Sequence, residues 1–177
     1  MTASPEALPL KIDIVSDVVC PWCIVGFRQL SKALEALPNL FTPTYHWHPF
    51  ELNPQMPAQG QELREHMRQK YGPSAGGGSG GRQRLLDLGH NLGFEFDYFE
   101  GMKMVNTFAA HQLLHWAAEQ NLQTELKLAL FSAFFQRRED VSDLELLVDV
   151  ASRVGLDSAE AAVVLEGGRY AQIVRDA

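Results

Sequence analysis

The chain has 177 residues, of which 46% are hydrophobic, and its formal net charge at pH 7 is −7. This length and apolar content fit one domain, or one domain that carries a large insertion. The negative charge, with no basic cluster larger than Arg137-Arg138, excludes a typical nucleic-acid interface. No apolar run is long enough to span a membrane, and residues 1–7 lack the apolar core of a secretory signal. We therefore expect a cytoplasmic protein without a membrane partner.

The most informative stretch lies between a predicted strand and a predicted helix. Ile12, Ile14 and Val15 are β-branched and apolar, and the first two follow the two-residue period of a buried strand. From Ile24 apolar residues recur every three or four positions, as in a helix. Between them stand Cys20 and Cys23, the only two cysteines of the chain. Cys20 is thereby placed at a helix N-terminus, where unpaired N–H groups and the helix dipole stabilise a thiolate.

This placement predicts the chemistry of the Cys20-Pro21-Trp22-Cys23 motif. We expect the pKa of Cys20 to fall to between about 4 and 7, which makes Cys20 the attacking sulfur. Cys23 is then the resolving thiol, able to release a substrate from a mixed disulfide. Pro21 suits the first helical turn because it has no N–H to leave unpaired. Trp22 is expected on the surface, beside the sulfur.

A metal site is the main alternative for two cysteines at this spacing. A structural zinc site needs two further ligands, and His46 and His48 lack the usual spacing of three to five residues. His111 and His115 lie four apart on a predicted helix, but no third ligand is evident, so we expect them to be hydrogen-bonded and partly buried. The residues favour a redox pair with no metal, and a non-catalytic zinc-binding module stays open as an alternative.

The remaining pattern changes from mixed to helical. A β-rich stretch at 42–50 predicts a second strand, which gives a strand–helix–strand unit with parallel strands. From Gln61 onward the sequence predicts helices and no strand, interrupted by a flexible glycine-rich loop at 72–81. We therefore expect two parts, a βαβ unit at 1–52 and an all-helical body at 53–177.

Three blocks of sequence resemble a known family. They are Ser16-Asp17 with the Cys-Pro-Trp-Cys motif, Pro49-Phe50-Glu51-Leu52-Asn53-Pro54, and Asn106-Thr107-Phe108-Ala109-Ala110-His111. Together they resemble the DsbA-like oxidoreductases of the FrnE type, over essentially the whole chain. The resemblance implies the α/β class and a thioredoxin-like fold with a large all-helical insertion. It also implies thiol:disulfide exchange with protein, peptide or small-thiol partners, without an organic cofactor and with glutathione as a candidate reductant.

The resemblance also ranks the functional alternatives. The related kappa glutathione transferases and hydroxychromene-carboxylate isomerases do not normally hold the second cysteine, so Cys23 argues against a glutathione-dependent transferase or isomerase. That function is kept as the first alternative. Because no histidine stands between the cysteines, we expect a reduction potential between about −250 and −160 mV.

Three further residues are candidates for the site. Thioredoxin-like relatives often hold a carboxylate six residues before the first cysteine, where this chain has Ile14. Asp17 is the nearest acid, which makes it the candidate for proton transfer. Phe50 and Met56, with Trp22, are candidates for an apolar surface that contacts the substrate.

The resemblance implies one more part of the fold. In this family a cis-proline loop, two antiparallel strands and a helix follow the helical insertion. Every proline of this chain lies at or before Pro73. We therefore expect this C-terminal ββα part to be absent from the chain, which would then be part of a protein about 30–50 residues longer. The sequence does not indicate an oligomeric state.

Overall fold

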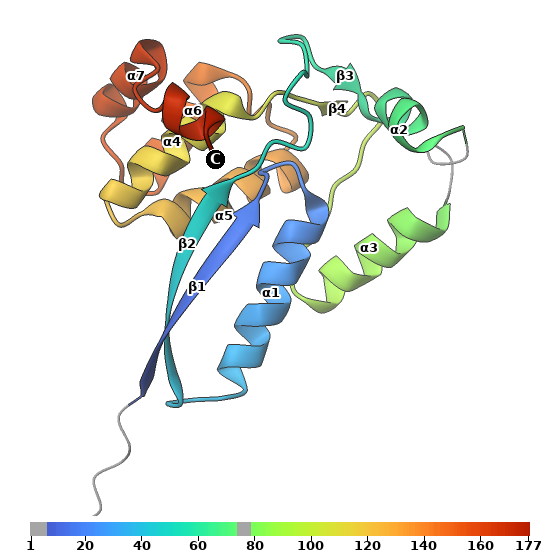
Figure 1. The fold of residues 1–177 in the computed structure, drawn as a ribbon. Coiled ribbons are helices and arrows are strands. Elements are labelled where there is room, and N and C mark those ends of the chain that lie inside the picture. The colour runs from blue at the N-terminus through green and yellow to red at the C-terminus, as the bar shows by residue number, and fades with distance from the viewer. Residues whose placement is uncertain (1–6, 74–78) are drawn as a thin grey trace, which may run out of the picture.

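The computed structural model describes residues 7–73 and 79–177, and two parallel strands organise it (Figure 1). β1 (Leu8–Ser16) and β2 (Phe41–Pro49) pair along their full length, so that Ser16 lies opposite Pro49. α1 (Pro21–Glu35) connects the two strands. The carboxyl ends of β1 and β2 therefore meet at one edge, directly before the start of α1. This is the predicted strand–helix–strand unit.

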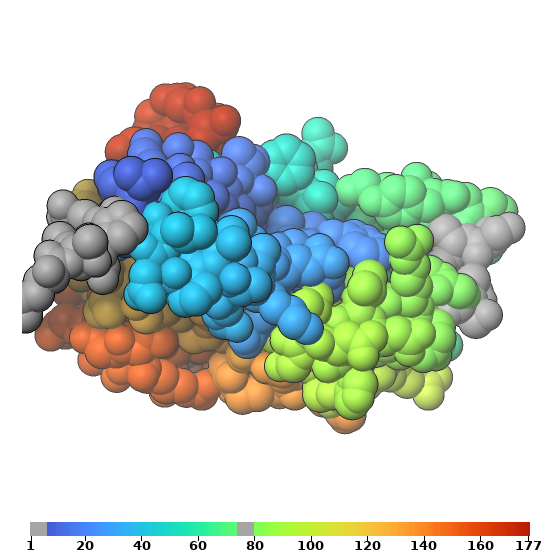
Figure 2. Space-filling view, turned by 90° about the horizontal axis from the view of Figure 1, so that it is seen from below, coloured from blue at the N-terminus to red at the C-terminus, as the bar shows by residue number. Residues whose placement is uncertain are grey.

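The rest of the described chain is almost entirely helical. α4 and α5 pack against β2, and α4 also contacts α7 and α8 (Figure 1). α3 lies beside α1 on the face shown in Figure 2. Within the described residues, no helix is both long and apolar enough to cross a bilayer. In chain order the helices are α2 (Leu63–Tyr71), α3 (Ser79–Asn91), α4 (Phe108–Glu119), α5 (Gln123–Gln136), α6 (Leu144–Arg153), α7 (Ser158–Gly167) and α8 (Ala171–Arg175).

Two details of the helical half differ from the sequence prediction. β3 (Gln61–Glu62) and β4 (Lys103–Met104) form a short antiparallel pair, so the prediction of no strand after Gln61 is wrong. Strands of two residues are too short to show an alternating pattern, which is why the sequence did not reveal them. The glycine-rich loop predicted at 72–81 lies partly outside the described residues, at 74–78, and α3 already begins at Ser79.

Trp47 of β2 joins the strand unit to the helical half. Its side chain is buried, and its ring contacts Phe27 of α1 and Phe131 of α5, with centroid distances of 5.1 and 6.3 Å. The indole N–H donates to the Thr124 hydroxyl at 3.0 Å. The side-chain amide of Gln123 accepts from the Trp47 backbone N–H and donates to its carbonyl, both at 2.9 Å. These contacts fix α5 against the strands, close to their carboxyl ends.

Gly89 of α3 lies where the packing leaves no room for a side chain. A Cβ at this position would lie 2.5 Å from the Phe94 carbonyl oxygen and 2.7 Å from the Phe96 ring. We expect Gly89→Ala to lower the free energy of unfolding by about 1–3 kcal/mol, measured by urea denaturation. Gly26→Ala in α1 is the control, because a Cβ there meets nothing within 4 Å. The control should gain about 0.5–1 kcal/mol, and equal stability of the two variants would contradict the packing argument.

Candidate functional site

Cys20 and Cys23 lie where β1 is followed by α1. Cys20 is the N-cap residue of α1, with φ −92° and ψ 108°, and Pro21 is the first helical residue. The backbone N–H of Cys23 donates to the Cys20 carbonyl at 3.2 Å, which closes the first turn. Both thiols are free and half-buried, and Cys23 also packs against the apolar core. The helix start thus holds two thiols one turn apart.

The two thiols ionise as a pair. The hydrogen bond from Cys20 is the largest influence on Cys23 and lowers its pKa to about 6, because it stabilises a thiolate there. The same bond raises the pKa of Cys20, burial raises it further, and the N–H groups of Cys23 and Trp22 oppose both effects. The sequence predicted a low pKa for Cys20. In the structure the low pKa is that of Cys23, which loses its proton first while Cys20 stays protonated.

Asp17 links the pair to the helical half. Its side chain is 1% exposed, and Oδ2 accepts from the Leu52 backbone N–H at 2.7 Å. Oδ1 lies 3.3 Å from Nε2 of His111, which is itself buried on α4. Burial alone would raise the pKa of Asp17, but the hydrogen bonds and charge from His111 and Leu52 lower it below 3.8. Asp17 is therefore a carboxylate at neutral pH.

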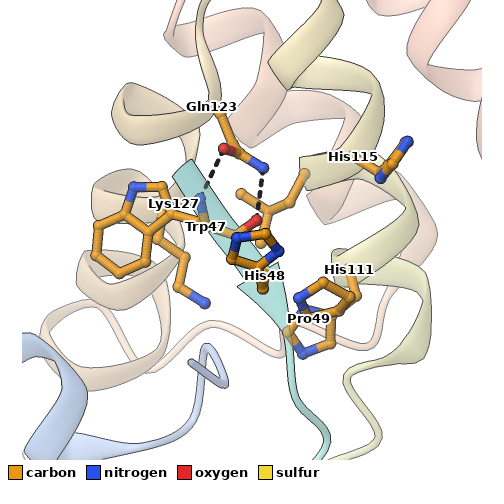
Figure 3. Close-up of a pocket in the computed structure, with 8 residues that line it drawn as sticks. Trp47, His48, Pro49, His111, His115, Gln123 and Lys127 are labelled. Atoms are coloured by element: carbon orange, nitrogen blue, oxygen red, sulfur yellow. Dashed lines mark hydrogen bonds between the residues drawn. The ribbon is translucent and has the colours of Figure 1, made fainter. Parts of the chain in front are cut away.

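Lys127 of α5 is the residue that the sequence reasoning missed. Its side chain is 1% exposed, and Nζ donates to the Ser16 carbonyl at 3.1 Å, at the carboxyl end of β1. Figure 3 shows Lys127 beside residues of β2 and α4 around a small pocket. The helical period could have indicated that Lys127 is buried. Position 127 precedes Phe131 by one helical turn and therefore lies on the same buried face of α5.

The three candidates for a substrate surface do not all lie on the surface. Trp22 is 52% exposed in the first turn of α1, and Phe50 is 51% exposed directly after β2. Both lie at the edge where the strands end. Met56 is only 8% exposed, so it cannot offer the predicted contact. Its loop folds inward, because the Asn106 side-chain amide donates to the Met56 carbonyl at 3.2 Å.

The other histidines considered as metal ligands, His46, His48 and His115, lie away from the two cysteines on β2 and α4. His46 and His48 are exposed on β2, and Nε2 of His48 lies 2.8 Å from the Asp13 carboxylate. The His115 ring packs on Tyr170 at a centroid distance of 4.9 Å. In residues 7–73 and 79–177, no three His, Cys, Asp or Glu side chains gather into a group that could hold a metal ion.

The family model of the DSBA-like thioredoxin domain matches residues 11–177, which include the whole site. The chain belongs to this family. A DSBA-like thioredoxin domain with a helical insertion accounts for both halves of the fold, and the family supports a disulfide oxidoreductase activity in general.

Individual relatives agree with this assignment. The DSBA-like chain is similar to the crystal structure of the probable DsbA oxidoreductase SCO1869 from Streptomyces coelicolor, at 31% identity and a TM-score of 0.85, over 94% of this chain and 72% of that one. It is 27% identical to the uncharacterized protein YwbO of Bacillus subtilis (strain 168), over 96% of this chain and 78% of YwbO. The cytosolic disulfide reductase DsbM from Pseudomonas aeruginosa shares the fold, at a TM-score of 0.62 and 15% identity, over 94% of this chain and 76% of DsbM.

Proposed function

We propose that the protein exchanges disulfides with its substrates through Cys20 and Cys23. The observation that supports this most strongly is the hydrogen-bonded pair of free thiols at the start of α1, whose first ionisation has a pKa of about 6. Because this pKa lies below 7, the pair holds a thiolate at neutral pH, and the thiolate is the reactive form.

Cys20 attacks and Cys23 resolves. On approach of a substrate disulfide, the proton of Cys20 passes to Cys23 along their hydrogen bond. The Cys20 thiolate attacks one substrate sulfur, the substrate S–S bond breaks, and the other sulfur leaves as a thiolate. This leaving thiolate takes up the proton of Cys23, which becomes a thiolate again. The Cys23 thiolate then attacks Cys20, and the Cys20–Cys23 disulfide forms as the second substrate thiol leaves. Two electrons pass to the substrate, and the reverse sequence oxidises a dithiol.

The Asp17 carboxylate has a positioning role in this scheme rather than the proton-transfer role considered for it. A group whose pKa is lowered below 3.8 is a weak base near pH 7, so it takes a thiol proton poorly. Its contacts with Leu52 and His111 instead join the ends of β1 and β2 to α4.

The substrates that we propose are protein or peptide disulfides and small thiols, with glutathione as a candidate reductant. The exposed aromatic rings of Trp22 and Phe50 support an apolar polypeptide substrate. We also propose that residues 1–52 act as the redox unit and residues 53–177 as the helical body that packs on it. Cytoplasmic location stays a prediction, which cell fractionation tests.

The proposed function is tested with two assays on the same preparation. We expect catalysis of insulin reduction by dithiothreitol, and catalysis of the oxidative refolding of reduced ribonuclease, with both activities dependent on both cysteines. A glutathione-dependent transferase or isomerase would keep its activity in Cys23→Ser. A zinc-binding module would show stoichiometric zinc and no disulfide turnover, and that result would contradict the proposal.

Trp22→Ala tests the substrate surface. Because Trp22 is 52% exposed and stands between the two cysteines in the chain, removal of its indole should raise KM for a peptide disulfide by about 3–10-fold. The KM for a small disulfide should stay unchanged. Steady-state kinetics with the two substrates measures the difference. Leu40→Ala is the matched control, since Leu40 is 50% exposed at the opposite end of the strands, before β2. If both variants behave alike, Trp22 does not contact the substrate.

A further inference from the structure

Lys127 is a buried cation with little hydrogen bonding. Its Nζ has three N–H groups, and the Ser16 carbonyl is the one acceptor that it reaches within the described part of the chain. The rings of Trp47 and Phe131 lie 5.4 and 5.2 Å from Nζ, which adds cation–π contact. Burying an ammonium costs several kcal/mol unless an opposite charge faces it. An anion close to Lys127 would therefore stabilise its buried positive charge.

The titratable groups that face Lys127 lie after β1, at the start of α1 and on α4. Asp17 follows β1, Cys20 and Cys23 stand on α1, and His111 stands on α4. Burial lowers the pKa of His111 below 6.5, so this histidine is neutral at pH 7. In the disulfide form the Asp17 carboxylate is then the one anion of this set. Reduction of the disulfide adds a second anion, the thiolate of the pair.

We propose that Lys127 is a positioning residue that stabilises the Cys23 thiolate and so raises the reduction potential of the pair. The inference rests on the proposed function and deepens it, because it assigns control of the redox site to a side chain of the helical half. Burial lowers the pKa of Lys127 to about 8, while Asp17 and both cysteines oppose that shift. At pH 7 the side chain is still mostly protonated and supplies the charge.

Two steps depend on this charge. When a substrate is bonded to Cys20, Cys23 must lose its proton before it can attack, and the ammonium of Lys127 stabilises the resulting thiolate. When the disulfide is reduced, the positive charge of Lys127 stabilises the thiolate of the product, so the pair becomes more oxidising. Loss of the charge should therefore slow release of the mixed disulfide and lower the potential.

A small cavity lies beside the Lys127 side chain. Lys127, His48, His111 and His115 are among the residues that line a pocket with room for about 10 Å³, close to the volume that one water molecule needs (Figure 3). The pocket is partly open, and His48 is exposed. This cavity is the route by which we expect protons to reach Lys127, so that its charge follows the redox state.

The test isolates Cys23 by the substitution Cys20→Ala. In this background the rate of alkylation by iodoacetamide is measured against pH, with and without Lys127→Met. We expect Lys127→Met to move the midpoint of the profile up by about one pH unit, which is a tenfold decrease in the ionisation constant of Cys23. Lys32→Met is the control, because it removes the same charge from the exposed far end of α1. An unchanged profile in Lys127→Met would overturn the proposal.

The potential gives a second readout with both cysteines present. In glutathione buffers, a tenfold shift toward the disulfide lowers the midpoint by about 30 mV in Lys127→Met, whereas Lys32→Met should match the wild type. If Lys127→Met does not fold, the proposal can still be tested on the wild-type protein. Carbon-13 NMR of labelled lysine should show a higher pKa for Lys127 in the reduced than in the disulfide form, and equal values would refute the inference. Failure of the proposed function would appear separately, as a wild type that exchanges no disulfides.

Discussion

Replacing Cys20 with serine should lower the rate of disulfide exchange by at least about 10³-fold. A serine hydroxyl is not ionised near pH 7, and it cannot form the S–S bond to the substrate on which the mechanism depends. Cys20 is also the N-cap residue of α1, where serine is a favourable residue, so the fold should be kept. The measurement is insulin reduction by the variant beside the wild type, with circular dichroism to confirm the fold.

Cys23→Ser is the matched variant, and it should fail differently. It keeps the attacking sulfur and loses the resolving one, so a mixed disulfide with the substrate should accumulate. Mass spectrometry without reductant should detect an adduct on Cys20, and addition of a small thiol should release it. Full turnover by Cys23→Ser would contradict the dithiol mechanism and favour the glutathione-dependent alternative.

Asp17→Ala should be the most destabilising polar substitution in the site. It takes the acceptor away from the Leu52 N–H and the partner away from Nε2 of His111, and it removes the carboxylate that faces Lys127. We expect the free energy of unfolding to fall by about 3–5 kcal/mol, because the buried ammonium of Lys127 loses its opposite charge. Urea denaturation of the disulfide form measures the loss.

Asp13→Ala is the control for Asp17→Ala. Asp13 also pairs with a histidine, His48, at 2.8 Å, but both side chains are about half exposed. Water replaces the lost contact there, so the unfolding midpoint should stay within error of the wild type. If both variants lose equal stability, burial of Asp17 is not the source of the effect.

The same buried pair predicts how stability depends on pH. The pKa values of His111 and Asp17 are lowered from 6.5 and 3.8, so the unfolded chain binds more protons than the folded one at low pH. Stability should therefore fall as the pH drops below about 6.5, when unfolded His111 takes up a proton. It should fall again as the pH passes through the lowered pKa of Asp17. Unfolding midpoints measured between pH 8 and 3 test this sign.

The strand–helix–strand unit could be predicted from sequence because each element is nine residues or longer and keeps one period throughout. The same holds for the thiol pair, whose place follows from the strand before it and the helix after it. The coupling of the two pKa values could not be predicted, because it depends on the hydrogen bond between the thiols in the folded chain.

Long-range contacts account for the features that the sequence did not reveal. Lys127 reaches the Ser16 carbonyl from 111 positions away, and His111 reaches Asp17 from 94 positions away. Met56 lies in a proline-rich loop whose sequence predicts exposure. Its burial depends on the hydrogen bond between its carbonyl and the side-chain amide of Asn106. No local periodicity encodes these pairings, because each joins a residue near the strands to the helical half.

Equilibration of the wild type with glutathione redox buffers, followed by acid quench, alkylation and intact mass, tests the central claim most directly. We expect one two-electron transition between a dithiol and an intramolecular Cys20–Cys23 disulfide, with a midpoint between about −250 and −160 mV. Two thiols that stay free across the whole range of buffers would contradict a redox-active pair.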